Sequence, residues 1–206
     1  SGLTNGTSTA FNVTAGPAAK LVFGTQPPAS AAAGGAFPVT VQVQDGGGNL
    51  LTTGTGSTSS VGIAILNNPG TSTLSGTTPV TAVGGIATFS LSLNKTGTAY
   101  TLVASSGTLT TATSTAFNIT PGAASALVFT QQPPANATAG QIMTPAIQVA
   151  VRDAQGNTVT TDTSSVTISS STTAFTGSTL IVAAASGVAT FSAIKPTTAG
   201  AANTLT

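Results

Sequence analysis

The chain contains no cysteine, histidine, glutamate or tryptophan, and very few of its side chains carry charge. Four Lys or Arg residues and three Asp residues stand among 206 residues and give a net charge of +1. Without Cys there is neither a disulfide scaffold nor thiol chemistry. Without His or Glu, acid–base catalysis would depend on the three Asp residues. The composition therefore predicts a protein that is not an enzyme and that holds no cofactor or metal.

The low charge also narrows the range of partners. Nucleic acid binding depends on clustered Lys and Arg that neutralise phosphates, and an anionic membrane surface attracts the same residues. No apolar run approaches the roughly 18 residues that span a bilayer. We therefore expect no nucleic acid partner and no membrane insertion. Surfaces with so little net charge do not repel one another, which favours self-association.

The sequence contains short segments in which apolar and polar residues alternate. Residues 39–43, 87–93 and 115–119 follow this pattern, and Thr, Val and Ile are frequent in them. Period-two alternation indicates β-strands with one face in the core and one in water. Gly and Pro interrupt the segments at short intervals, and no stretch has the pattern of an amphipathic helix. Many short strands separated by turns predict a sandwich or a barrel.

The chain also contains an internal repeat, which is the strongest signal in the sequence. Three blocks recur 106 residues apart, namely 8–14 at 114–120, 21–23 at 127–129 and 26–29 at 132–135. Two more recur at offsets of 108 and 102, namely 41–45 at 149–153 and 85–90 at 187–192. The offsets drift between blocks, as they would if loops differed in length. The spacing suits two domains of about 100 residues each.

The sequence begins and ends at different points of the repeat, so the two units contain different numbers of predicted strands. A full unit covers residues 15–120 and ends in a strand over roughly 108–120. The second unit covers residues 121–206. It ends at the counterpart of the strand that precedes the last strand in the full unit. Residues 1–14 repeat the last strand ahead of the first unit. We therefore expect an all-β chain in which the second unit lacks its last strand and an extra strand lies at the N-terminus.

The repeated motifs resemble bacterial Ig-like repeats of large surface adhesins and of the invasin/intimin group. The resemblance is carried by residues 20–28, 114–117, 149–157 and 187–192. It implies two tandem immunoglobulin-like Greek-key β-sandwiches, secretion and a place at the cell surface. One departure is Asn203, which stands where the first unit has Tyr100, a position that resembles the core-capping Tyr of many such sandwiches.

Two hypotheses explain the unequal units. In the first, the protein is the subunit of an extracellular filament, a head-to-tail homopolymer in which residues 2–14 complete the second domain of a neighbour by β-strand addition. The expected donor residues are Leu3, Thr7, Thr9, Phe11 and Val13, and the expected acceptor residues are Asn203 and Leu205.

In the second hypothesis, the sequence is a module of a much longer surface adhesin, and the missing strand follows residue 206. The module would then act as a stalk or spacer, or bind a ligand itself. Surface glycans and other cells remain open as further partners in both hypotheses. Aromatic residues are only 4% of the chain, so no aromatic binding cluster is expected.

Several smaller motifs allow a functional and a plain interpretation. Residues 45–49 and 153–157 resemble Ca²⁺ loops, but one Asp in each is poor support for 6–8 oxygen ligands, and a hairpin turn is favoured. Lys20 and Asn118 could form an isopeptide bond, although a solvated Lys is favoured. The Asn-x-Thr pattern of glycosylation occurs at Asn5, Asn12, Asn94, Asn118 and Asn136.

Overall fold

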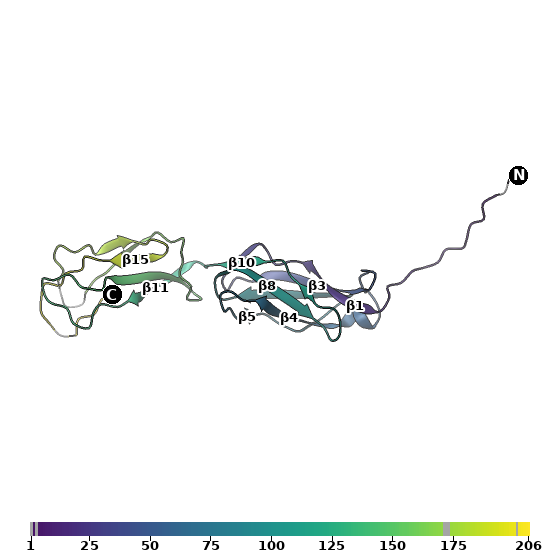
Figure 1. Ribbon diagram of the computed structural model, residues 1–206, viewed down its shortest axis with the longest axis horizontal. Helices are drawn as coiled ribbons and strands as arrows, with labels where there is room; N and C mark the ends of the chain where they lie inside the picture. Colours follow the sequence, from purple (N-terminus) through teal and green to yellow (C-terminus); the bar gives the residue numbers. More distant parts are fainter. Residues whose placement is uncertain (1, 3, 171–173, 201) are drawn as a thin grey trace.

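The computed structural model describes residues 2, 4–170, 174–200 and 202–206. In this part of the chain the secondary structure is β-strand apart from one short 3-10 turn, η1 (Thr55–Thr58). No described helix is long and apolar enough to cross a membrane. Two β units lie end to end, and we call residues 15–120 domain 1 and residues 121–206 domain 2 (Figure 1). The prediction of an all-β chain is confirmed.

Domain 1 is a sandwich of two sheets. Its strands are β1 (Ala18–Thr25), β2 (Ser30–Ala32), β3 (Phe37–Asp45), β4 (Ser60–Asn67), β5 (Leu74–Ser75), β6 (Val80–Thr81), β7 (Ile86–Leu93), β8 (Gly97–Ser105), β9 (Ala112–Thr113) and β10 (Phe117–Thr120). One sheet has the order β1-β3-β7-β5, and the other has β2-β10-β8-β4-β6 with β9 beside β8. This is the ABED and CFG arrangement of an immunoglobulin-like sandwich, as the resemblance to bacterial Ig-like repeats implied.

Alternation along the strands builds the core of domain 1. Val39, Val41 and Val43 of β3 are fully buried, while the residues between them face outward. Across the sandwich, Phe117 of β10 packs on Phe37 with ring centroids 5.5 Å apart. Each buried side chain of this size stabilises the fold by about 1.5–3 kcal/mol through removal of apolar surface from water.

The last strand of domain 1 closes both sheets. Residues 117–120 lie between β2, to which they are parallel, and β8, to which they are antiparallel. Earlier in the same segment, Thr110 donates its N–H to the Ala19 carbonyl and accepts from the Leu21 N–H. The sequence predicted one strand over 108–120, and the structure divides it into β9 and β10. The division arises because the segment moves from the edge of β1 to the edge of β2.

Domain 2 repeats the first half of this pattern. Its strands are β11 (Ala124–Gln131), β12 (Ile147–Asp153), β13 (Ser165–Thr167), β14 (Ile181–Ala183) and β15 (Val188–Phe191). The order β11-β12-β15 matches β1-β3-β7, and β11 pairs with β12 in the same register as β1 with β3, including the two irregularities. Ile147, Val149, Val151 and Phe191 lie in a separate core.

Domain 2 has no counterpart of β10 among its described residues. The segment equivalent to β8 is reduced to a single bridge between Leu205 and Ser170. The consequence is visible on β11, where Leu127 is 56% exposed although its counterpart on β1, Leu21, is only 3% exposed. An apolar side chain that is core in one repeat is therefore surface in the other.

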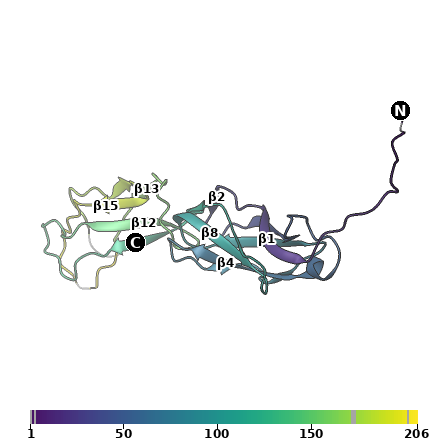
Figure 2. The same ribbon diagram turned by 45° about the vertical axis from the view of Figure 1, so that its right-hand side comes forward.

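The segment before domain 1 is not a strand in this single chain. Residues 4–14 pair with no sheet and extend away from the end of domain 1 that is opposite to domain 2 (Figures 1 and 2). Phe11 and Val13 are 80% and 85% exposed. The predicted extra N-terminal strand is thus extended chain without a partner, because a strand needs a neighbour for its backbone N–H and C=O groups.

Candidate assembly site

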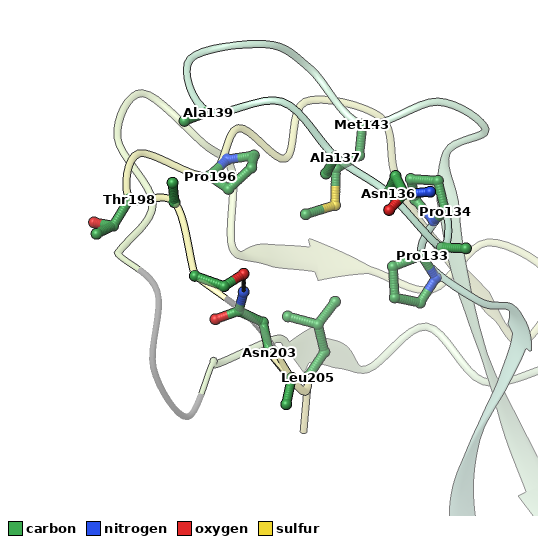
Figure 3. A pocket seen from close by; sticks show the side chains of 14 residues that line it. Pro133, Pro134, Asn136, Ala137, Ala139, Met143, Pro196, Thr198, Asn203 and Leu205 are labelled. Atoms are coloured by element: carbon green, nitrogen blue, oxygen red, sulfur yellow. Dashed lines mark hydrogen bonds between the residues drawn. The ribbon is translucent and has the colours of Figure 1, made fainter.

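A groove with a volume of about 580 Å³ opens on domain 2 beside the C-terminal segment. One wall is formed by residues 133–139 with Met143, and the other by residues in the ranges 196–200 and 202–205. Figure 3 shows the side chains of Met143 and Leu205 pointing into the space between these segments. Most of the lining residues are Pro, Ala, Met and Leu, and polar atoms of the walls also face the groove, so it offers both apolar contacts and hydrogen-bonding groups.

The repeat explains why this groove exists. In domain 1, β10 occupies the space between β2 and β8. The counterparts of β2 and β8 in domain 2 lie near residues 136–138 and 203–206, which are the two sides of the groove. The groove therefore lies where a last strand would insert side chains equivalent to Phe117 and Ile119.

A second hollow of about 310 Å³ lies beside β11. It is lined by residues 124–127 together with Val151, Asp162 and Ser164. In domain 1 the corresponding edge of β1 is covered by Thr110, which exchanges backbone hydrogen bonds of 2.9 and 3.0 Å with that strand. The two hollows together follow the path that residues 109–120 take in domain 1.

The expected acceptor residues lie at the groove, and the expected donor residues do not reach it within one chain. Leu205 is half-buried in the wall, and Asn203 donates its side-chain N–H to the Gly200 carbonyl at 3.0 Å. Phe11 and Val13 project from the extended N-terminal segment.

The remaining donor candidates differ in how far the structure describes them. Thr7 and Thr9 are exposed. Leu3 lies outside the described residues.

Some residues that line the groove and the second hollow were not predicted from the sequence. Pro133, Pro134 and Met143 line the groove, and Leu127 borders the second hollow. The repeat itself carried a signal for Leu127, because its counterpart Leu21 stands beside the last strand. Met143 has no counterpart in the repeated blocks, so the alignment offered no signal for it.

The turn at Asp45 is a hairpin, as the plain interpretation predicted. The Asp45 carboxylate accepts hydrogen bonds from the N–H of Gly16 and of Asn49, both at 2.8 Å, and from the Asn49 side chain. Asp153 is bonded in the same way by Gly122 and Asn157. In the part of the chain that the structure describes, no three Asp, Glu, His or Cys residues come together. Both carboxylates therefore accept hydrogen bonds from N–H groups of the protein itself.

The hydrogen bonds make Asp45 more acidic than an ordinary Asp. The Asn49 side chain, followed by the N–H groups of Gly16 and Asn49, lowers the pKa of Asp45 to about 2. Burial opposes ionisation of Asp153, but bonds from Asn157 and Gly122 outweigh it and lower that pKa as well. A carboxyl whose folded pKa lies below its unfolded value stabilises the fold above the unfolded pKa.

We expect the stability of domain 1 to be constant from neutral pH down to about 4 and to fall between about 4 and 2. The sign follows from Asp45, because the unfolded chain binds the proton first as the pH is lowered. Thermal unfolding as a function of pH measures the fall, and ¹³C NMR of the carboxyl groups measures the pKa directly. An Asp45 midpoint near the ordinary value of 3.8 would show that the turn does not hold the carboxylate.

The structure separates the two residues considered for an isopeptide bond. Lys20 pairs with Gln44 on β1 and β3, and its ammonium approaches Gly48 in the turn. Asn118 lies on β10 in the other sheet, and its side-chain oxygen accepts from the Ala99 N–H at 3.0 Å. The favoured interpretation, a Lys that remains unlinked, agrees with this arrangement.

The five Asn-x-Thr sites differ in their surroundings, and glycosylation stays a prediction. Asn5, Asn12 and Asn136 are exposed. Asn94 is half-buried, and its side-chain oxygen accepts from Ser72 and from the Thr73 N–H. Asn118 is exposed but bonded to Ala99. Of the five, Asn94 is the least accessible to a glycan.

No protein-family model and no curated protein sequence matches the chain. Among solved structures, it is similar to the Escherichia coli adhesin FdeC, with 18% identity, a TM-score of 0.42 and coverage of 90% of this chain and 62% of that chain. It is also similar to domains 4–9 of the surface layer protein SbsC, with 14% identity, a TM-score of 0.38 and coverage of 88% and 32%. It is similar as well to the D0-D1 domain of intimin, with 15% identity, a TM-score of 0.35 and coverage of 91% of this chain and 95% of that chain.

The chain therefore spans less than two thirds of the length of the first two of these structures. Two of the three, the adhesin FdeC and intimin, belong to the groups of proteins that the repeat motifs resemble. At TM-scores below 0.5 these similarities carry no argument about what this chain does. The assignment of an Ig-like β-sandwich therefore depends on the strand order of domain 1 and on its partial repetition in domain 2.

Proposed function

We propose that the protein is a structural subunit of an extracellular or cell-surface fibre. Subunits join head to tail, and residues 2–14 of one subunit enter the groove of domain 2 in the next as its last strand. The observation that carries the proposal is a match between two parts of one sequence. A free segment repeats the last strand of domain 1, and domain 2 has an open groove where such a strand belongs.

The apolar side chains of the segment support this pairing. Phe117 and Ile119 are 1% and 3% exposed in domain 1, where they fill the space between β2 and β8. Phe11 and Val13 are their counterparts and are exposed on the free segment. Burial of two such side chains stabilises an association by roughly 3–6 kcal/mol before the cost of ordering the segment is subtracted.

The backbone of the segment supports the same register. In domain 1, Thr110 bonds to Ala19 and Leu21. The counterpart of Thr110 in the free segment is Thr4, and the edge of β11 offers Leu127 in the equivalent place. A strand laid here would gain main-chain hydrogen bonds from the sheet edge and would cover Leu127, as in other cases of β-strand addition.

The placement of the two parts supports head-to-tail growth. The free segment leaves domain 1 at the end opposite to domain 2, and the groove lies on domain 2 (Figure 1). A donor at one end and an acceptor at the other make a heterologous contact, which builds open fibres rather than closed pairs. Such an arrangement needs no further partner.

A second candidate function is favoured by the continuity of domain 1. There, β10 follows β8 along the same chain and closes its own sandwich. Residues beyond Thr206 in a longer polypeptide would fill the groove in the same manner. The protein would then be a stalk or adhesive module of a surface adhesin rather than a fibre subunit.

The two candidates are separated by a variant that lacks residues 2–14 and a synthetic peptide of that sequence. We expect the variant to be monomeric, and we expect the peptide to raise the melting temperature of domain 2 without changing that of domain 1. Peptide at 100 times its dissociation constant stabilises the acceptor by about 2.7 kcal/mol.

The control peptide carries Phe11→Ser and Val13→Ser and should have no effect. If the deletion variant still forms fibres, or if the native peptide leaves domain 2 unchanged, the fibre proposal is wrong. Intact mass of material from the native source then tests the second candidate, which requires a chain much heavier than 19.6 kDa.

A further inference from the structure

Domain 1 and domain 2 meet through one turn of domain 2. The Asn157 side chain donates to the Asn94 carbonyl at 3.0 Å and accepts from the Thr96 N–H at 3.3 Å. Lys95 donates from its ammonium to the Gln155 carbonyl at 3.0 Å. Asn157 is only 6% exposed. We call the loop over residues 94–96 of domain 1 the seat, because its backbone groups bind the Asn157 side chain of the next domain.

The free end of domain 1 carries the same turn, already in the same conformation. Asn49 donates its side-chain N–H to the two Asp45 oxygens at 3.2 and 3.0 Å, and Asn157 does so to Asp153 at the same distances. Asn49 is exposed, whereas Asn157 is buried. The Asp45 carboxylate thus holds the Asn49 side chain in the conformation that Asn157 has at the junction, although Asn49 makes no such contact within this single chain.

The chain enters both turns in the same way. The Gly16 N–H donates to Asp45 at 2.8 Å, and the Gly122 N–H donates to Asp153 at 2.9 Å. Gly122 follows β10, so the last strand of domain 1 leads directly to the seated turn. A last strand supplied by residues 2–14 would lead to the Asn49 turn by the same route.

Domain 2 has a related backbone hydrogen bond at its far end. In domain 1 the seat follows Leu93, whose carbonyl accepts from the Gly34 N–H at 2.8 Å. In domain 2 the Pro196 carbonyl accepts from the Gly140 N–H at 2.7 Å. Residues 197–199 follow Pro196 as residues 94–96 follow Leu93. The seat binds Asn157 through backbone groups alone, so an equivalent seat at residues 197–199 would not depend on their side chains.

We propose that Asn49 is a docking residue between subunits and that it binds the Thr197 carbonyl and the Ala199 N–H of a second copy of this chain. This inference rests on the proposed fibre, because the donor strand brings the two ends together. Lys95 and Gln155 of the internal junction have Thr198 and Gly47 as counterparts. The contact between subunits therefore keeps the bonds of the Asn and loses the bond that the Lys95 ammonium donates to the Gln155 carbonyl.

Pairs of introduced cysteines test this docking without background, because the chain has no cysteine of its own. Asn49→Cys is combined with Ala199→Cys, and assembled protein is treated with a short bismaleimide. We expect a ladder of covalent dimers, trimers and larger species on a denaturing gel. Asn157→Cys with Thr96→Cys should react within one chain and give no ladder.

Asn49→Cys with Thr190→Cys is the off-site control, because Thr190 is an exposed residue of β15. It should give no ladder. Fibres that form without a ladder from the Asn49 and Ala199 pair would overturn the docking and leave the donor strand intact. If the parent chain itself fails to assemble, and the double variant gives neither fibres nor a ladder, both the fibre proposal and the docking proposal are overturned.

Discussion

Replacement of Phe11 and Val13 with alanine is expected to abolish fibre assembly while leaving the fold of each subunit unchanged. Both side chains are at least 80% exposed in the single chain, so their removal creates no cavity there. In the assembled state they take the places of Phe117 and Ile119, which are buried. Loss of a buried Phe alone costs about 3–5 kcal/mol, which weakens the contact by more than about 100-fold.

Sedimentation or electron microscopy measures the assembly, and circular dichroism verifies the fold. Ala10→Ser is the matched control, because its counterpart Ala116 is exposed beside the buried Phe117. This control should assemble as the native chain does. Equal assembly by the Phe11/Val13 double variant and by Ala10→Ser would show that the segment is not a donor strand.

The substitution Phe117→Ala is expected to destabilise domain 1 by about 3–5 kcal/mol, a large fraction of the stability of a small domain. Phe117 packs on Phe37 and lies 5.9 Å from the Tyr100 ring, so its removal leaves a cavity between the sheets. Phe11→Ala makes the same chemical change in the repeated sequence, and in the monomer it should leave unfolding unaffected. Urea unfolding of the two variants measures the difference.

Ala116→Ser controls for disturbance of the β10 segment and should change stability by less than about 0.5 kcal/mol, as is usual at exposed sites. A Phe11→Ala variant that destabilises the monomer as much as Phe117→Ala would mean that the N-terminal segment packs within its own subunit. A Phe117→Ala variant with native stability would contradict the structure of domain 1.

The strands could be predicted from sequence because burial acts through a simple period. Val39, Val41 and Val43 alternate with polar residues and are all buried. Domain 2 could be located from the repeat because β11 and β12 share the Leu-Val-Phe and Val-x-Val-x-Asp motifs of β1 and β3. The division of the last strand at Ser114 could not be predicted, because it depends on which strand edge the chain meets. Ser114 donates its N–H to the Leu102 carbonyl while Thr115 turns to Gln26.

The candidate site was only partly predictable for a similar reason. Phe11, Val13 and Leu205 could be proposed as site residues because the repeat aligns them with residues of domain 1. The junction between the domains was missed, because Asn157 has the local sequence of a turn residue, and only its position against the loop over residues 94–96 makes it a contact. The sequence predicts the conformation of such a turn but not which residues the turn contacts in the folded chain.

A cryo-electron microscopy map of the assembled fibre tests the central claim most directly. We expect residues 2–14 of each subunit to lie as a strand in domain 2 of its neighbour, with Phe11 and Val13 between residues 133–139 and Leu205. A groove filled by a segment of its own polypeptide, with residues 2–14 placed elsewhere, would contradict the account.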